Sequence, residues 1–408
     1  MAKSTDRRLL SAAVAAFCLA LAVRGAAAWY SGAAQPNEIR YVTIARGILN
    51  GQGYSGLDKR FPDIIQPPLF PMMLVGALIT GCPELDVSRG VSALMGSLLV
   101  FPVAFLTQRL FGGKAARRAP FLIAFYPLLV HTSSAALTES TFALLVLTGV
   151  LALWRAFDVE EARRRWILIL VSGGLLGASF LTRPEGLAFL AVAGLVLVVA
   201  VRHQTVAWSA VLRSGGCLLA GFAIVLLPYL LWIHGKTGHW MLAPKAMLAW
   251  VHNSLILEGQ REGWKEPFGS SIYNERVKFG LYKDNSAIRS QELFAAASGA
   301  PLAGILDNDD PGIDLIKPRA MLSLLTGNLL KLYDSMKGGY VIPPLLLVLA
   351  GIGLTSRPWT GSFGRSALIA ITFFLGSLSF LLTFYMPRYL YSAVCFGLPW
   401  VAAGWHQA

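Results

Sequence analysis

The chain contains several apolar segments that are too long for a water-soluble fold of its size to bury. Three of them cover residues 167–181, 188–201 and 218–233. Hydrophobic residues make up 55% of the 408 residues and charged residues only 14%, whereas soluble proteins carry about 25% charged residues. A bilayer accepts such segments as helices, because a helix satisfies its own backbone groups. The sequence therefore predicts an all-α, polytopic membrane protein.

Hydropathy predicts about ten membrane spans. They cover 9–29, 90–110, 119–135, 140–157, 166–182, 186–201, 214–233, 340–355, 366–384 and 389–405. The apolar stretch 67–80 is short and begins with two prolines, so we expect it to lie at the outer membrane interface. Segment 39–49 has Tyr41 on an apolar helical face and Arg40 elsewhere, which predicts a second juxtamembrane helix.

The distribution of charge supports this topology. The net charge is +13. With ten spans, the segments on the side of the termini hold 14 basic and 4 acidic residues, and the two long segments on the opposite side, 30–89 and 234–338, hold 17 and 16. Because cytoplasmic loops carry the basic excess, both termini are predicted to be cytoplasmic. A basic excess confined to short loops also argues against a nucleic-acid partner.

The predicted topology divides the chain into three parts. Residues 1–233 form a membrane module with a first outer loop at 30–89, residues 234–338 form a large outer loop, and residues 339–408 form the C-terminal spans. The basic N-terminus and its apolar segment fit either a cleavable signal peptide or a signal anchor. A multi-pass protein favours the anchor, and both alternatives leave Glu38 outside.

Polar residues gather at the predicted outer ends of the spans. They include Glu38, Asp63, Glu139, Arg183, Glu185, Lys245 and Arg388. Carboxylates at membrane depth are costly and usually mark function. Structural roles are the alternative: Glu38 as a helix N-terminal acid, Asp63 as a turn residue, Glu139 and Glu185 as caps or partners of Arg183, and Arg388 as an interfacial side chain.

Acids and cations at a bilayer edge suit a lipid-linked phosphate substrate. Arginine and lysine bind phosphate, and a carboxylate accepts a proton from an incoming hydroxyl or amine. The histidines at 131, 234, 239 and 252 lack the spacing of metal ligands. These features favour an enzyme that acts on a lipid phosphate.

Six segments together resemble the C-type (GT-C) membrane glycosyltransferases, specifically the protein-mannosyltransferase-like branch that includes the aminoarabinose transferases of lipid A. They are Asn-Glu-Ile-Arg-Tyr at 37–41, Gln-Pro-Pro-Leu-Phe-Pro at 66–71, Leu-Thr-Glu at 137–139, Leu-Thr-Arg-Pro-Glu-Gly at 181–186, the stretch 237–245, and Arg-Tyr-Leu at 388–390. The order and spacing of these segments carry the resemblance over nearly the whole chain.

The resemblance implies transfer of a sugar, with inversion, from a polyprenyl-phosphate donor on the outer (periplasmic) face of the inner membrane. The acceptor stays open between a lipid, a glycan and a protein. The family has a first-loop acid as catalytic base. Asn37 stands at the first of its two acidic positions, which leaves Glu38 or Asp63 as the base.

The resemblance also implies the remaining site residues. Lys245, Arg183 and Arg388 are expected to bind the donor phosphate, since Gln66 stands where the family often has a basic residue. Further substrate contacts are expected from Tyr41, Gln66, Glu139, Glu185 and Tyr389. A divalent metal near the first-loop acids stays open, and no other cofactor is expected.

A transporter or flippase for a lipid-linked or anionic substrate is the alternative. Such a protein is expected to show internal repeats and charges near mid-membrane. The chain shows no evident repeat, and its acids gather at one edge, so the glycosyltransferase is favoured.

Overall fold

The computed structural model describes residues 2–55, 62–64, 66–202, 208–238, 240, 242, 318–337, 339, 341–359, 361–382 and 385–408. Over these residues the regular structure is helical, apart from an isolated β-bridge between Ser55 and Pro62. The predicted all-α class is therefore confirmed for the part of the chain that the structure describes.

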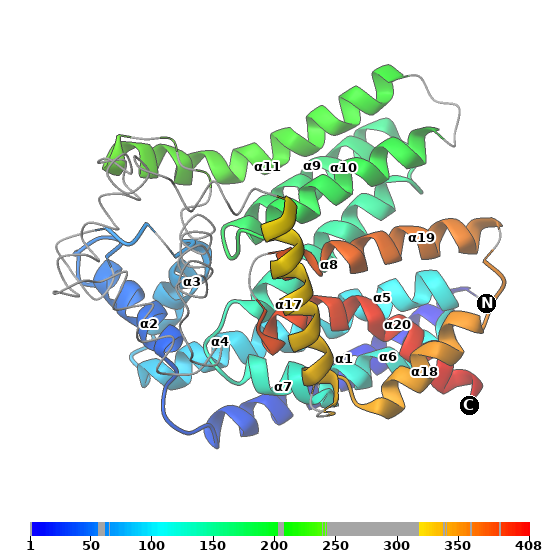
Figure 1. Cartoon of the computed structure of the whole chain (residues 1–408), viewed down its shortest axis with the longest axis horizontal. Helices are drawn as coiled ribbons and strands as arrows, with labels where there is room; N and C mark the ends of the chain where they lie inside the picture. The colour runs from blue at the N-terminus through cyan, green and yellow to red at the C-terminus, as the bar shows by residue number, and fades with distance from the viewer. Residues whose placement is uncertain are drawn as a thin grey trace.

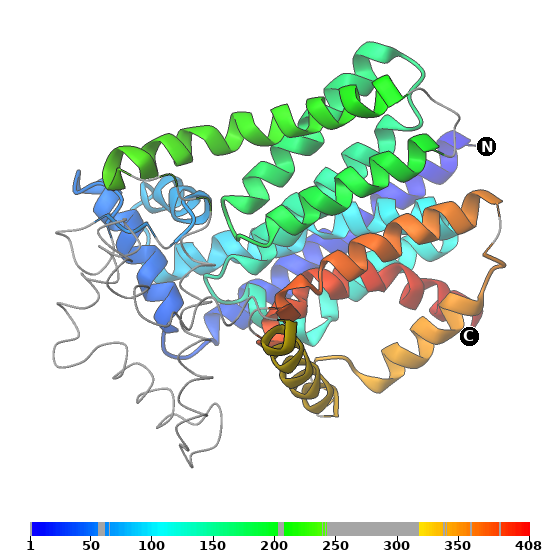
Figure 2. The same ribbon diagram turned by 45° about the horizontal axis from the view of Figure 1, so that its top comes forward.

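Long helices lie side by side in a bundle, with both chain termini at the same end (Figure 1, Figure 2). They are α1 (Ala2–Trp29), α4 (Glu84–Leu98), α5 (Val100–Phe111), α6 (Gly113–Phe125), α7 (Pro127–Ser133), α8 (Glu139–Ala156), α9 (Ala162–Phe180), α10 (Gly186–Arg202), α11 (Trp208–Thr237), α18 (Pro344–Thr355), α19 (Gly361–Gly376) and α20 (Tyr391–Gln407). Helix α4 continues into α5 as one span, Glu84–Phe111. The spans alternate in direction along the chain, so the turns between them gather at two ends (Figure 1).

Four described helices are long and apolar enough to cross a membrane: Arg7–Trp29, Glu84–Phe111, Glu139–Ala156 and Ser209–Lys236. Shorter apolar helices pack beside them. The chain is thus a multi-pass membrane protein, while the number of ten spans and the large outer loop at 234–338 stay predictions.

Two short helices pack against each other at the end of the bundle away from the termini (Figure 1). Helix α2 covers Pro36–Leu49 and α3 covers Leu69–Leu78, which confirms the short helices predicted at 39–49 and 67–80. The Tyr41 ring meets Phe70 edge-on, with centroids 5.2 Å apart. Both rings are almost fully buried, so the apolar face of α2 is covered by α3.

Helix α17 (Pro318–Lys337) runs across the bundle helices instead of along them (Figure 1). The sequence analysis assigns this region to the large outer loop at 234–338, and α17 is a helix of 20 residues within it. The amide of Asn328 is buried and donates to the Leu381 carbonyl, at 2.8 Å, in the short 3₁₀ helix η1 (Ser379–Leu382). This hydrogen bond joins α17 to η1.

A buried arginine in α1 compensates for the break between α6 and α7. Pro127 has no N–H, so it leaves the Ile123 carbonyl, four residues earlier, without its helical donor. Arg24 donates to this carbonyl at 2.8 Å and to the Ser133 hydroxyl at 2.8 Å. Arg24 is fully buried, and these contacts explain a charge that would otherwise be costly inside a membrane span.

Candidate active site

Three turns meet at the end of the bundle away from the termini. They are the turn before α8 at 134–138, the turn between α9 and α10 at 181–185, and the segment from η1 through η2 (Pro387–Leu390) to α20. The second turn is tight, because a Cβ atom on Gly186 would lie 2.5 Å from the Phe180 nitrogen. Glycine at this position lets the chain reverse directly over the end of α9.

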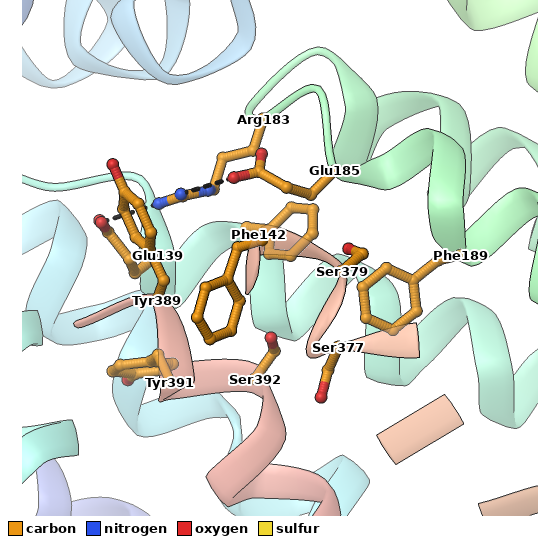
Figure 3. Close-up of a pocket in the computed structure, with 11 residues that line it drawn as sticks. Glu139, Phe142, Arg183, Glu185, Phe189, Ser377, Ser379, Tyr389, Tyr391 and Ser392 are labelled. Atoms are coloured by element: carbon orange, nitrogen blue, oxygen red, sulfur yellow. Dashed lines mark hydrogen bonds and ion pairs between the residues drawn. The ribbon is translucent and has the colours of Figure 1, made fainter. Parts of the chain in front are cut away.

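Four charged residues on these turns form what we call the ion-pair cluster: Glu139, Arg183, Glu185 and Arg388. One oxygen of Glu139 lies 2.8 Å from Arg183 Nη1 and 3.2 Å from Arg388 Nε. Arg183 Nη2 lies 2.8 Å from Glu185. Figure 3 shows Arg183 between the two carboxylates. The sequence predicts these four residues as substrate contacts or mutual partners, and the structure brings them together.

Aromatic rings surround the ion-pair cluster. The Arg183 guanidinium lies 4.3 Å from the centre of the Tyr389 ring, within cation–π range. Phe142, Phe189 and Tyr391 line a small pocket beside Glu139 and Arg183 (Figure 3). Phe380 lines the same pocket. Apolar walls exclude water, which strengthens the electrostatic interactions within the cluster.

Glu139 is 4% exposed, and one of its oxygens has no hydrogen-bond partner among the described residues. Buried polar atoms are nearly always satisfied, so an unsatisfied carboxylate oxygen beside a pocket is a candidate ligand contact. The unsatisfied oxygen distinguishes Glu139 from Glu38 and Asp63, the two carboxylates that the sequence predicts as the base.

Glu38 lies in the first turn of α2, fully buried, and both of its oxygens are bonded. Arg89 Nε lies 3.0 Å from Oε1, which also accepts the Ala136 N–H at 2.8 Å. Oε2 accepts the Gln35 N–H at 2.7 Å. The helix-N-terminal alternative is thus confirmed. Glu38 and Arg89 also line a cavity of about 530 Å³ beside the end of α1, so a catalytic role stays a prediction.

The charge of Glu38 is stabilised in this setting. Burial by itself would raise the pKa of the carboxyl, but the hydrogen bonds from Arg89 and from the backbone N–H groups of Gln35 and Ala136 outweigh burial and lower it. A carboxylate with a lowered pKa holds protons weakly, which makes Glu38 a poor proton acceptor in this conformation.

Asp63 is also paired. Its Oδ2 lies 2.8 Å from Arg40 Nη2, and its Oδ1 accepts the Gln66 N–H at 3.0 Å. The Tyr54 hydroxyl donates to the Gln66 carbonyl at 2.8 Å. Asp63 and Gln66 therefore hold the end of the first-loop segment in front of α3.

Tyr41 reaches toward the ion-pair cluster from α2. It is 3% exposed, and burial, reinforced by the charge of Glu139, raises its pKa to about 12. The phenol therefore stays neutral and able to donate a hydrogen bond. Lys245, the remaining predicted cation, lies outside the described residues.

The sequence analysis does not name Arg89 among the candidate site residues. The available signal is a single cation within a run of small and apolar residues at the start of a predicted span. Such a residue needs a buried acidic partner, and Glu38 is the partner.

Among the described residues of the first outer loop, the carboxylates are not arranged to bind a divalent cation. In the described part of the chain, no three His, Cys, Asp or Glu side chains come together as a metal-binding group. The oxygens of Glu38 and Asp63 face arginines, which compete with a cation for the same lone pairs.

Solved structures with the same fold are GT-C glycosyltransferases. The Archaeoglobus fulgidus oligosaccharyltransferase AglB, in complex with an inhibitory peptide and a dolichol-phosphate, matches 98% of this chain at 14% identity and a TM-score of 0.56. The same enzyme with Zn and sulfate gives a TM-score of 0.58 at 14% identity, over 97% of this chain and 49% of that chain. The chain spans about half the length of AglB, 50% in the first match.

ArnT from Cupriavidus metallidurans bound to undecaprenyl phosphate matches 96% of this chain and 76% of its own, at 16% identity and a TM-score of 0.48. No curated protein sequence matches the chain. The likeness to AglB shows that the two proteins share a helical fold.

Residues 66–251 match the sequence profile of the dolichyl-phosphate-mannose-protein mannosyltransferase family. The matched part includes Glu139, Arg183 and Glu185 of the ion-pair cluster. The predicted resemblance to the mannosyltransferase-like GT-C enzymes is therefore confirmed.

Proposed function

We propose that the chain transfers a sugar from a polyprenyl-phosphate donor to a lipid, glycan or protein acceptor on the outer face of the inner membrane. The observation that carries this proposal is the buried ion-pair cluster, Glu139 with two arginines, at the end of a GT-C bundle. The dolichol-phosphate bound to AglB, a protein of the same fold, supports a lipid phosphate as ligand.

In this proposal Arg183 and Arg388 bind the donor phosphate. Both guanidiniums share one oxygen of Glu139, so the carboxylate holds them in place and leaves other N–H groups for the phosphate. Arg388 is the more accessible of the two, with 22% of its side chain exposed. Lys245 stays a predicted third cation.

Glu139 is our first choice for the carboxylate that contacts the acceptor. Its second oxygen is unsatisfied among the described residues, whereas both oxygens of Glu38 are occupied. The acceptor hydroxyl or amine attacks the sugar carbon, the bond from that carbon to the phosphate oxygen breaks, and the lipid phosphate leaves with the electron pair. The carboxylate takes the acceptor proton, and attack opposite the leaving group inverts the sugar carbon.

A transfer assay with radiolabelled polyprenyl-phosphate sugars tests the assignment. We expect Glu139→Gln to lower turnover by roughly 100-fold or more, as loss of a general base does. Glu38→Gln and Asp63→Asn, made in parallel, test the two bases predicted from the sequence. Elution volume and melting temperature of each purified variant separate lost chemistry from lost folding.

The possible outcomes are distinct. Near wild-type turnover in Glu139→Gln together with an inactive, folded Glu38→Gln moves the base to Glu38. If purified wild type consumes no donor in the panel, while vesicles that contain it move a lipid-linked substrate, the transporter replaces the glycosyltransferase.

Arg388→Gln is expected to raise the donor concentration needed for half-maximal rate, because it removes a cation from the phosphate site. The matched control is Arg213→Gln, an exposed arginine of α11 whose described contact is with the Ser209 carbonyl in its own helix. The donor concentration series is measured for both variants. An equal donor requirement in Arg388→Gln and wild type contradicts the phosphate role.

A further inference from the structure

The C-terminal ends of α5 and α8 lie at the end of the bundle where both termini lie (Figure 1). Side chains of these two helices line a groove. Its volume is about 580 Å³, and it is lined by Phe105, Gln108, Arg109, Leu151, Trp154 and Arg155. The groove is separate from the ion-pair cluster, which includes Glu139 at the opposite end of α8.

The groove changes from apolar to basic along the helices. Phe105 comes one helical turn before Arg109 in α5, and Leu151 comes one turn before Arg155 in α8. The apolar pair thus lies toward the middle of the bundle, and the basic pair lies at its end. Phe105 is 50% exposed, so the apolar part is open to the hydrocarbon of a bilayer.

The basic part of the groove contains two arginines and one carboxylate. Arg109 binds Asp158 through both of its terminal nitrogens, one at 2.8 Å, and its guanidinium lies 4.8 Å from the centre of the Trp154 ring. Arg155 is 69% exposed and lies 3.8 Å from the same Asp158. Arg109 is therefore held in place, whereas Arg155 is accessible. Together with Asp158, the two arginines carry a net positive charge.

We propose that this groove binds an anionic glycerophospholipid, with its phosphate beside Arg109 and Arg155 and its acyl chains along Phe105 and Leu151. Basic pockets between membrane helices bind the headgroups of anionic lipids on the cytoplasmic side. The loops at this end of the bundle are those with the basic excess, which agrees with that side. The site does not depend on the proposed glycosyltransferase activity.

Native mass spectrometry of the purified full chain tests the proposal, with phosphatidylglycerol and phosphatidylcholine of equal chain length as probes. Wild type is expected to retain phosphatidylglycerol after phosphatidylcholine has been removed. Arg155→Gln is expected to lower this retention roughly fivefold, the factor for one interfacial cation. The control is Arg164→Gln, which removes an equal charge from an arginine paired with Glu161 outside the groove.

A photoreactive phosphatidylglycerol places the bound lipid, and we expect its label within 100–111 and 139–156. Four results overturn the proposal: equal retention of both lipids, an equal loss in Arg164→Gln and Arg155→Gln, label confined to other helices, or displacement of the lipid by millimolar inorganic phosphate. The last result identifies a site for free anions instead of lipid.

Discussion

Gly221→Ala is expected to destabilise the protein strongly, although alanine is the better helix former. Helices α9 and α11 cross so closely that a Cβ atom on Gly221 would lie 2.1 Å from the Leu170 carbonyl oxygen. On the facing helix, a Cβ atom on Gly173 would lie 2.0 Å from the Leu218 carbonyl oxygen. Backbone atoms cannot rotate away as side chains do, so the two helices must separate.

The expected cost is at least about 3 kcal/mol, the upper end of the usual range for overpacking. The melting temperature of the purified protein measures it. The matched control is Gly216→Ala in the same helix, where a Cβ atom meets nothing within 4 Å. We expect the control to be neutral or slightly stabilising. Equal melting temperatures for the two variants contradict the close contact of α9 with α11.

Arg89→Leu is expected to lower the free energy of unfolding by about 3–5 kcal/mol, because it leaves a buried carboxylate without its cation. Glu38 is fully buried, with Arg89 Nε 3.0 Å away. Arg89 also donates to the carbonyls of Ser31 and Gly32, at 3.2 and 3.1 Å. The substitution therefore frees the connection between α1 and α2 as well.

The pH dependence of the Arg89→Leu effect identifies its origin. In wild type the pKa of Glu38 lies below its ordinary value of 4.5, so the stability that Glu38 contributes is present above pH 4.5 and is lost as pH falls. Without Arg89, burial favours the neutral carboxyl and raises its pKa. The stability difference between wild type and Arg89→Leu is therefore expected to narrow on acidification.

Two comparisons complete the Arg89 experiment. The double variant Glu38→Gln/Arg89→Leu is expected to recover part of the loss, because no charge is left buried. Arg46→Leu removes an arginine from the exposed pair with Glu84 and is expected to cost about 1 kcal/mol or less. A pH-independent loss that Glu38→Gln does not relieve points to the Ser31 and Gly32 contacts as the whole effect.

Much of the architecture could be predicted from the sequence, because it depends on local pattern. Apolar runs indicate most of the helices and their approximate bounds. Periodicity predicts a short helix at 39–49 and the short apolar stretch 67–80 predicts another, and the structure has these helices at 36–49 and 69–78. Because successive spans cross the membrane in opposite directions, the predicted topology places four charged residues at the same end of the bundle without any knowledge of packing: Glu139, Arg183, Glu185 and Arg388.

Which charges pair was decided by the tertiary structure. Arg183 with Glu185 is a local pair, two residues apart, and the sequence analysis includes it among the structural alternatives. Arg89 with Glu38 and Arg388 with Glu139 join residues 51 and 249 positions apart. Such pairs depend on which helices are neighbours, and hydropathy carries no information about neighbours.

The sequence by itself thus determined the class of fold, most of its helices and the end of the bundle at which the ion-pair cluster lies. Only the tertiary structure showed that the oxygens of Glu38 are occupied while Glu139 keeps one unsatisfied among the described residues. The physical reason is that hydrophobic periodicity is a property of single helices, whereas the environment of a buried carboxylate is made by atoms from several of them.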